Sequence, residues 1–465
     1  MHRGHDHPVH DAFATRHKYP VFDSQVFVAP GANVKLVVGT GERQQADKVL
    51  LTEDRPWEVR IDNGYPNVIH QQDSPRFRLW YDCFILCADP RRGCSPKPAT
   101  VNGTHIPTSG TLYAESDNGI EWNKPNLSLV PFHDSVDNNI MIAGTHGLGI
   151  TYERAPVNGR RYKAFGARTD QLVTGTMQSD DGLHWSDFEP SRPDFDNRFD
   201  THHNHFYDSA TQRHVLVTRG LLAPGRLVNR TIAFAESNSS TFGNFSRAEV
   251  RFATGDAHDQ FYSMQVFPYF SAYLGIVMVY DSHYVGRHAA DGVRCQLAYS
   301  NDLKRWQRLS EDIIPRPPGI MNCFAAKPVV ADGRVHIFYM AGDGPHFGLR
   351  RTALQLSTFR IDGLLGARVA NESLGHGTLS TRPLRVVGDN VAASFDGSIR
   401  VSVAHNGTVI YAAKDCILFT GPAIDARVQW RGSGNQPLAK LRGEEVVLTV
   451  DMYGADASLY TLSFV

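Results

Sequence analysis

The sequence has no apolar run near the roughly 20 residues that a transmembrane helix needs, and a helical periodicity is almost absent from it. Charge of one sign is lacking too: 47 Lys and Arg face 48 Asp and Glu, the formal net charge is −1, and no basic block occurs. Neither nucleic acid nor an anionic membrane is therefore an expected partner. What remains is ordinary globular material, 42% hydrophobic and 20% charged over 465 residues, which is long enough for more than one domain.

Cysteine is scarce, with six residues in the chain. Cys83, Cys87 and Cys94 lie in a segment rich in Pro, Gly and Arg, and they lack the paired C-x-x-C spacing and the close fourth ligand of a zinc site. We expect one disulfide within residues 83–94 and buried free thiols among Cys295, Cys323 and Cys416.

No apolar segment of a signal peptide is visible at the N-terminus. Seven N-x-S/T sequons nevertheless favour a glycosylated protein of the secretory pathway. We therefore expect a secreted or extracellular location. The sequons begin at Asn102, Asn126, Asn229, Asn238, Asn244, Asn371 and Asn406.

A turn motif recurs along the chain. Its copies stand at residues 116–122 (SDNGIEW), 179–185 (SDDGLHW), 237–245 (SNSSTFGNF) and 300–306 (SNDLKRW). The aromatic residues that end the copies follow one another after 63, 60 and 61 residues. A fixed period of this kind indicates a repeat architecture, and the motif itself is typical of a structural hairpin turn with a packed aromatic ring.

A strand-turn-strand pattern rich in aromatic residues accompanies the motif. It occurs five times, at residues 65–82, 147–168, 203–220, 264–281 and 325–342, and each copy is followed by a further strand pair. Four strands per repeat are the anatomy of a propeller blade. The sequence therefore predicts an all-β fold with a five-bladed β-propeller.

Beyond the fifth repeat, short alternating strands follow at roughly ten-residue spacing, which is typical of a β-sandwich. We expect three parts: an N-terminal segment with a ring-closing strand (residues 1–55), the propeller (residues 56–370) and a C-terminal β-sandwich (residues 371–465).

A five-bladed propeller followed by a sandwich, with S-x-D-G-x-x-W turns, resembles the glycoside hydrolase clan of families 32 and 68 and the related families 43 and 62. The resemblance covers about Pro56 to Val465 in architecture. The phrases PWE (56–58), FRLWYD (77–82) and VFPYFSAYLGI (266–276) look most like uncharacterised proteins similar to the family 32 N-terminal domain. This resemblance implies a glycosidase that binds its carbohydrate where the inner strands begin and requires no cofactor.

Cleavage of a glycosidic bond needs two carboxyl groups in opposed roles, one protonated and one ionised. Four carboxylates stand where inner strands are expected to begin: Asp62, Asp137, Asp200 and Asp259. Crowding in one funnel would raise the pKa of at least one of them. We expect Asp200 and Asp62 to be the acid/base pair, assisted by Asp137 or Asp259.

The sequence departs from family 32 at the residues that matter most. The family's NDPN phrase carries the nucleophile, and the comparable stretch here is GYPN, so that Tyr65 occupies the nucleophile's place. Either Asp62 takes over, or a Tyr nucleophile acts, or the double-displacement mechanism is lost. Asp200 looks like the transition-state-stabilising Asp of the RDP phrase. No stretch matches the phrase that carries the general acid Glu, and Glu236 is a poor substitute.

Histidine is abundant, with 21 residues. His203 and His205 fall on one face of a strand and, with His258 and His346, form an alternative metal site. Histidines that act as a general acid, or that are satisfied between blades, are the rival interpretations.

A sugar site also needs rings that stack on sugar faces and side chains that bond hydroxyl groups. The residues expected to bind substrate are Tyr65, His202, His203, Tyr262, Gln260, Asn322, His346 and Trp57.

Three hypotheses follow. The first is a glycoside hydrolase acting on a furanoside or related oligosaccharide or polysaccharide. The second is a metal-dependent polysaccharide lyase that uses the histidines. The third is a glycan-binding propeller without catalysis.

Overall fold

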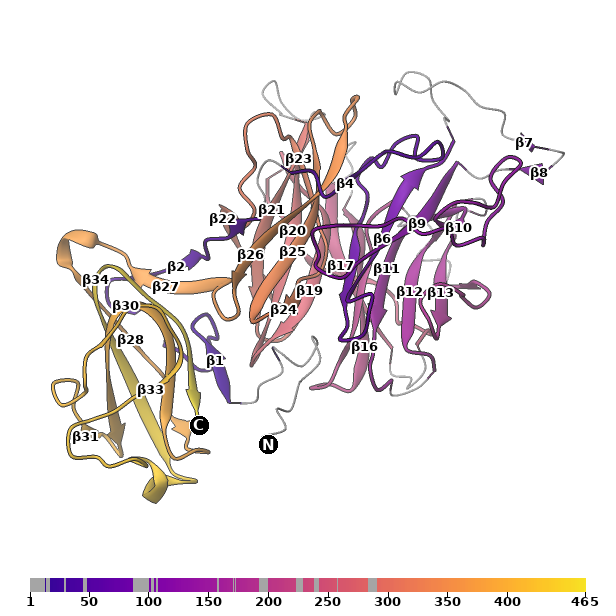
Figure 1. Ribbon diagram of the computed structural model, residues 1–465. Coiled ribbons are helices and arrows are strands. Elements are labelled where there is room, and N and C mark those ends of the chain that lie inside the picture. The colour runs from indigo at the N-terminus through magenta and orange to yellow at the C-terminus, as the bar shows by residue number, and fades with distance from the viewer. Residues whose placement is uncertain are drawn as a thin grey trace.

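The computed structural model describes residues 13, 17–28, 31–44, 48–86, 100–101, 104–105, 108–156, 159–169, 171, 173–191, 200–222, 229–237, 242–256, 258–282 and 291–465. Its elements are strands β1 to β34 and two single-turn 3-10 helices, η3 (Glu372–Leu374) and η4 (Ala439–Leu441). Figure 1 shows a large body of sheets beside a smaller C-terminal one. Within the described ranges, no helix is long and apolar enough to cross a membrane.

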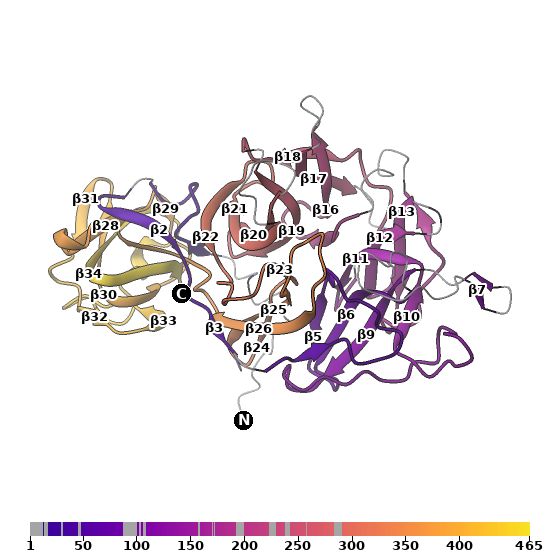
Figure 2. The same ribbon diagram turned by 90° about the horizontal axis from the view of Figure 1, so that it is seen from above.

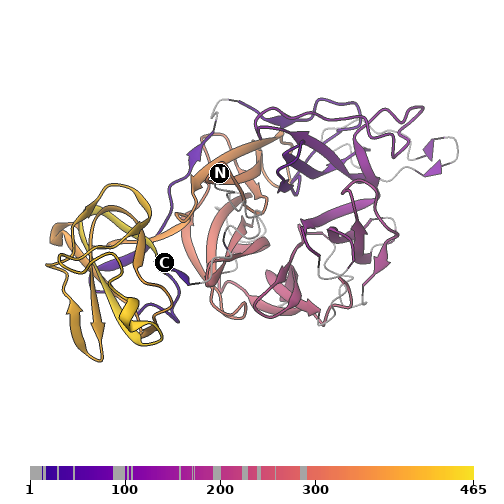
Figure 3. The same ribbon diagram turned by 60° about the horizontal axis from the view of Figure 1, so that its bottom comes forward.

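The larger body consists of five blades, which Figure 3 shows arranged in a ring. Blade 1 contains β5 (Asn67–His70), β6 (Phe77–Phe84), β9 (Ser109–Ser116) and β10 (Ile140–Ala143). Blade 2 contains β11 (Thr145–Tyr152), β12 (Tyr162–Arg168), β13 (Val173–Ser179) and β14 (Glu189–Pro190). Blade 3 contains β15 (Asn204–Asp208), β16 (Arg213–Leu222), β17 (Asn229–Ser237) and β18 (Glu249–Phe252).

Blade 4 contains β19 (Asp259–Tyr269), β20 (Ala272–Asp281), β21 (Gly292–Ser300) and β22 (Gln307–Asp312). Blade 5 contains β23 (Asn322–Ala325), β24 (Val329–Ala331), β25 (Arg334–Gly342) and β26 (Thr352–Arg360), and its outer edge is completed by β3 (Glu42–Arg43) and β4 (Leu51–Thr52). The blade count predicted from the repeat is confirmed. The hairpin β7 (Thr100–Val101) and β8 (Thr104–His105) lies outside the blades.

The first and last blades pack directly against each other. Phe338 of blade 5 makes edge contacts with Phe77 and Trp122 of blade 1, with ring centroids 5.9 and 5.6 Å apart. Middle strands such as β20 are buried along nearly their whole length, because each blade is covered on both faces by its neighbours.

The recurring turn motif has one geometry in all three tryptophan-ending copies. In the copy at 179–185, Asp181 Oδ1 accepts the backbone N–H groups of Leu183 and His184 at 2.9 and 2.8 Å, and Trp185 Nε1 donates to Gly182 O. Gly182 has φ 79°, and a Cβ there would lie 2.9 Å from Trp80 of blade 1. The motif therefore closes a turn and joins neighbouring blades, which is the structural role expected of it.

The C-terminal body is built on two long strands, β30 (Val391–His405) and β34 (Glu445–Phe464), which pair along most of their length. The ladder shifts between Asp396 and Ser398, where Gly397 has φ 73° and faces Ala457 at a distance that leaves no room for a side chain. Both halves of this bent ribbon bury side chains in one core. The two layers of the predicted sandwich are thus joined in one sheet.

Shorter strands extend that sheet on both sides. Along β34 lie β1 (Lys18–Pro20), β27 (Leu365–Val369), β28 (His376–Ser380) and β29 (Leu384–Arg385), and β2 (Val34–Val38) pairs with β27. Along β30 lie β31 (Thr408–Tyr411), β32 (Phe419–Thr420) and β33 (Ala423–Arg427). The N-terminal segment therefore supplies strands to both bodies (Figure 2).

Arg360 ties the two bodies together. From the end of β26 its Nε donates to Asp362, its Nη1 to Asp396 and its Nη2 to the Ala423 carbonyl, at 2.8, 2.7 and 2.6 Å. The guanidinium also lies 4.4 Å from the ring centroid of Tyr460. Because these donors are fixed in one plane, the pairs fix the orientation of the sandwich on blade 5.

Cys83 is free and packs in the same core cluster as Leu79 and Tyr81 of β6. Cys87 and Cys94 lie outside the described residues, so a disulfide within residues 83–94 stays a prediction. Cys416 is a buried free thiol as expected, but the expectation for the other two cysteines is wrong, because a disulfide joins Cys295 of blade 4 to Cys323 of blade 5. Sequence spacing did not indicate this pair, because the two cysteines meet only where β21 and β23 run side by side.

We expect Asp181→Ala to lower the free energy of unfolding by about 1–2 kcal/mol, because two backbone N–H groups lose a charged acceptor. Asp180→Ala is the matched control, since its side chain is 75% exposed and makes only a 3.5 Å contact with Arg160. Urea unfolding of both variants measures the difference. Equal stabilities would contradict a structural role for the motif.

Candidate active site

One end of the propeller channel gathers charged and aromatic side chains, and we call this end the mouth. It lies where the inner strands β5, β11, β15, β19 and β23 begin. Its residues are Asp62, Asn63, Tyr65, Asp82, His146, Asp200, Arg219, Arg230, Tyr262, His346 and Arg350, and each makes a direct contact with at least one other.

The turn before β5 has an unusual backbone. Asp62 and Tyr65 have φ values of 61° and 37°, and Gly64 between them has 67°. A non-glycine residue in this region carries strain, which persists only where surrounding contacts hold it. The turn therefore marks a site at which side-chain position is maintained at a cost in stability.

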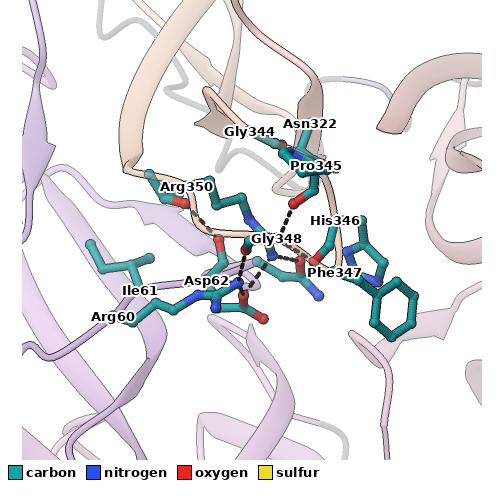
Figure 4. A network of polar contacts seen from close by, with 12 residues as sticks. Arg60, Ile61, Asp62, Asn322, Gly344, Pro345, His346, Phe347, Gly348 and Arg350 are labelled. Atoms are coloured by element: carbon teal, nitrogen blue, oxygen red, sulfur yellow. Dashed lines mark hydrogen bonds and ion pairs between the residues drawn. The ribbon is translucent and has the colours of Figure 1, made fainter. Parts of the chain in front are cut away.

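Asp62 is held between two guanidinium groups (Figure 4). Arg350 Nη2 donates to its Oδ1 at 2.6 Å, and Arg60 forms an ion pair with the same oxygen. The Asp62 side chain is 15% exposed, whereas Arg350 is fully buried. Two cations on one oxygen favour the ionised carboxylate, so Asp62 is a poor candidate for a protonated general acid.

His146 of blade 2 bridges two carboxylates, one from blade 1 and one that precedes the first strand of blade 3. Its Nδ1 lies 3.2 Å from Asp82 Oδ2, and its Nε2 lies 3.3 Å from Asp200 Oδ1. Burial alone would lower the pKa of His146, but the hydrogen bonds with Asp200 and Asp82 outweigh it and raise that pKa to about 10. His146 is therefore an imidazolium at neutral pH. Asp82 is fixed in turn by the Gly147 N–H and the Thr111 hydroxyl.

Asp200 is the most exposed carboxylate of the mouth, with a side chain 57% exposed. Desolvation by the surrounding protein would raise its pKa, but the hydrogen bond from His146 and the charge of Arg219, whose Nη1 is 3.5 Å away, hold the pKa below its usual range. Asp200 is thus an ionised carboxylate that a ligand can reach.

Tyr65 does not have the properties of a nucleophile. Its hydroxyl lies 3.2 Å from that of Tyr262 and 3.0 Å from Asn63 Nδ2, and its ring stacks on His202. Burial, together with the nearby Tyr262 and Asp200, raises the pKa of Tyr65 well above 10, so the phenol stays neutral. The Tyr-nucleophile alternative has no support in this geometry.

Two predicted carboxylates lie away from the mouth. Asp137 is exposed, accepts a hydrogen bond from Asn126 and precedes β10, the outer strand of blade 1. Asp259 does begin an inner strand, β19, but its carboxylate is bound by Arg294 and Arg308 from the outer strands of blade 4. The expectation that all four carboxylates converge is wrong, because the turn before β10 mimics the sequence pattern of an inner strand.

The histidines that follow Asp200 are buried, and burial lowers the pKa of His202 and of His203, so these two are neutral. His202 bonds Gln265 and Asn67, and burial lowers its pKa to about 3. His203 contacts Thr218 and the ring of Phe165, and His205 contacts Thr151 and Phe242, so both lie between blades 2 and 3.

The alternative metal set is not assembled. His258 is exposed at the start of blade 4 and shares no contact with His203 or His205. The described part of the chain holds no group of three or more His, Cys, Asp or Glu side chains placed to bind a metal ion.

The other predicted sugar-binding residues differ in whether they lie at the mouth. Gln260 accepts a hydrogen bond from Arg230, and His346 packs 5.0 Å from the ring of Tyr262, so both belong to the mouth. Asn322 is buried beside the start of the loop 344–350 and donates to the Gly344 carbonyl (Figure 4). Trp57 instead donates to Asn139 and packs on Phe132 in blade 1.

Six mouth residues were not predicted from the sequence: Asn63, Asp82, His146, Arg219, Arg230 and Arg350. Asp82 ends the repeat unit at 65–82 and His146 directly precedes the unit at 147–168, so an alignment of the repeats would have placed both near the channel. The arginines lie on second and third strands or in the loop 344–350, and no local signal distinguishes them from other arginines.

The channel has a cavity at its other end. It has a volume of about 1140 Å³ and is lined by the distal ends of the inner strands, including Tyr152, Glu153, Tyr207 and Lys327. A pocket of about 10 Å³ beside Asp62, Tyr65, Asp82 and His146 marks the mouth. The distal cavity is larger and is also lined by carboxylates, including those of Glu153, Asp180 and Asp332. The mouth differs in that Asp82 and Asp200 share one imidazole between them and Asp200 also lies beside an arginine, and for this reason we take the mouth as the candidate site.

The sequence matches no protein-family model and no curated protein sequence. Three solved structures of similar shape each align with 70% of this chain at 13% identity. A glycosyl hydrolase from Bacteroides ovatus has a TM-score of 0.47 and is covered over 94% of its length. A structure described under the GH130 family of mannoside phosphorylases, with hydrolases that target β-1,2 mannosidic linkages in Candida mannan, has 0.46 and 94%. An N-acetylgalactosamine deacetylase from F. plautii, bound to blood group B trisaccharide, has 0.41 and 95%.

We expect the chemical shifts of the His146 ring protons to report a titration midpoint near pH 10 in the wild type. In Asp200→Asn the midpoint falls by more than about one unit, because one of two carboxylate partners is lost. Nuclear magnetic resonance of the histidine ring signals measures both. A wild-type midpoint near the ordinary value of about 6.5 would contradict the charged bridge.

Lys327 at the distal cavity provides a second pH test. Burial lowers its pKa to about 7, and none of the residues that the structure describes forms a hydrogen bond with its Nζ. The unfolded chain therefore binds more protons between about pH 7 and 10, and this lysine makes wild-type stability rise with pH in that window. Lys327→Met should raise Tm most at pH 7 or below, with a gain that shrinks toward pH 10.

The exposed Lys304→Met is the control for that experiment and should show no such trend. A gain from Lys327→Met that is independent of pH would contradict the lowered pKa.

Proposed function

We propose that the protein is a carbohydrate-active enzyme that cleaves a glycosidic bond at the mouth of its propeller. The observation that supports this best is Asp200, a half-exposed carboxylate kept ionised by His146 and Arg219. Glycoside cleavage passes through a transition state with positive charge on the sugar ring, and an ionised carboxylate in reach of that ring stabilises it.

Asp200 serves as the base that activates water or as the nucleophile that attacks the anomeric carbon. Its low pKa keeps it ionised throughout the neutral range and well into acid. The acid limb of the pH–rate profile is accordingly expected below the ordinary aspartate value of about 3.9.

His146 is the proposed proton donor to the leaving oxygen. Its proton is retained by the hydrogen bonds to Asp200 and Asp82. When Asp200 bonds the sugar or takes up a proton, it loses its negative charge, and the pKa of His146 falls. Proton release is thereby coupled to the step that consumes the carboxylate.

Asp62 lines the same small pocket as His146 and supplies a second fixed negative charge. Because Arg60 and Arg350 hold it ionised, we assign it electrostatic stabilisation and not proton donation. This differs from the acid/base pair that the sequence suggested.

We propose the reaction type and the substrate class from the resemblance of the sequence to glycoside hydrolase families 32, 43 and 68. This resemblance favours hydrolysis of a furanoside or a related oligosaccharide. A metal-assisted lyase reaction has no comparable support, because the histidines invoked for it are separated.

The test is a digest of a broad oligosaccharide set by wild type, Asp200→Asn and His146→Gln, read by mass spectrometry. We expect products that have gained one water, with the rate falling by at least about 100-fold in each variant. Asp137→Asn is the matched control, because this exposed carboxylate lies on the outer edge of blade 1.

Products lighter by one water would show that the protein cleaves the glycan by elimination and not by hydrolysis. Binding of a glycan by the wild type without any product would favour the non-catalytic alternative, and unchanged activity in Asp200→Asn would contradict the proposed role.

A further inference from the structure

Two guanidinium groups share one aromatic ring at the mouth. The Cζ atoms of Arg219 and Arg230 lie 4.5 and 5.4 Å from the ring centroid of Tyr262, and Arg230 is also 5.1 Å from that of Tyr280. Like charges repel, so two guanidinium groups on one tyrosine are a costly arrangement unless an anion accompanies them.

The donors of Arg219 are poorly satisfied for a side chain that is 6% exposed. Its Nη2 donates to the Tyr262 carbonyl at 3.3 Å, its Nη1 lies 3.5 Å from Asp200 Oδ2, and no acceptor from the described residues reaches its Nε. A guanidinium carries five N–H donors in a fixed fork. Arg230 is partly exposed and donates a 2.8 Å hydrogen bond to Gln260.

Among the described residues, cations exceed carboxylates in this part of the mouth. His146, Arg219 and Arg230 all lower the pKa of Asp200, and the other described carboxylate in contact with them is Asp82, on His146. The nearby Asp291 already accepts hydrogen bonds from the Tyr280 hydroxyl and the Phe347 N–H.

We propose that Arg219 and Arg230 bind an acid group of the substrate, so that the glycan is anionic: a uronate, or a sugar carrying a sulfate or phosphate ester. This inference rests on the proposed function, because it places the acid group on the sugar that Asp200 faces. The planar fork of arginine matches the oxygens of a carboxylate or a sulfate in a bidentate manner, and the Tyr262 ring orients both forks.

The test measures binding without turnover. Tm of the wild type is recorded with D-glucuronate, D-glucose 6-sulfate and D-glucose, with ionic strength matched by sodium chloride. We expect the two anionic sugars to raise Tm by about 2 °C or more at saturating concentration, and glucose to leave it unchanged. The larger of the two anionic shifts distinguishes a carboxylate substrate from an ester.

Arg230→Gln should remove most of the Tm shift. Arg219→Lys should do the same although it keeps the positive charge, because lysine lacks the planar guanidinium fork. Arg76→Gln, which alters an arginine at the distal end of the channel, should retain it. No anion-specific shift in the wild type, or an equal shift in Arg230→Gln, would overturn the inference.

The digest separates this inference from the proposed function. Products from neutral glycans alone would leave the function in place and reject the acid group. A rise in Tm with the anionic sugars, without product from any glycan, would keep the binding of an acid group and reject the proposed glycoside cleavage.

Discussion

A protonated imidazole held between two carboxylates is the interaction on which the mouth depends. Asp82 belongs to blade 1, His146 to blade 2, and Asp200 precedes the inner strand of blade 3. Asp200 keeps Arg219 beside it, but among the described residues His146 is the cation that contacts the buried Asp82, so removal of His146 would leave Asp82 as a buried negative charge without a counterion. The bridge thus joins three blades and fixes the charge of Asp200.

The aromatic floor beneath this bridge limits what the mouth can do. Tyr65, Tyr262 and His346 are buried, and burial keeps the first two as phenols and the third as a neutral imidazole, whose pKa is lowered to about 3. These groups provide shape and hydrogen bonds but no charge. Charge at the mouth comes from the arginines, His146 and the aspartates, which is why their balance decides the class of ligand.

Much of the fold follows from the sequence, because a repeated turn needs the same residues each time. Asp181 and its equivalents must accept two N–H groups, so the motif is legible in one sequence and its period yields the blade count. The C-terminal strands were equally readable from their alternation. Register and blade contacts were not, and the Cys295–Cys323 bond is an example.

The site was only half predictable. Asp62 and Asp200 precede inner strands and were found, whereas Asp137 precedes an outer strand with the same local pattern. His146 carries no motif, since its role comes from carboxylates 54 and 64 residues away in sequence that only the ring of blades brings to it. Secretion and occupancy of the sequons stay predictions.

The most direct test of the central claim is a crystal structure of the protein with a bound oligosaccharide obtained from the digest. We expect sugar density at the mouth, with a sugar hydroxyl group donating a hydrogen bond to Asp200 and the sugar in contact with the Tyr262 side of the mouth. Density confined to the distal cavity beside Lys327, with the mouth empty, would contradict it.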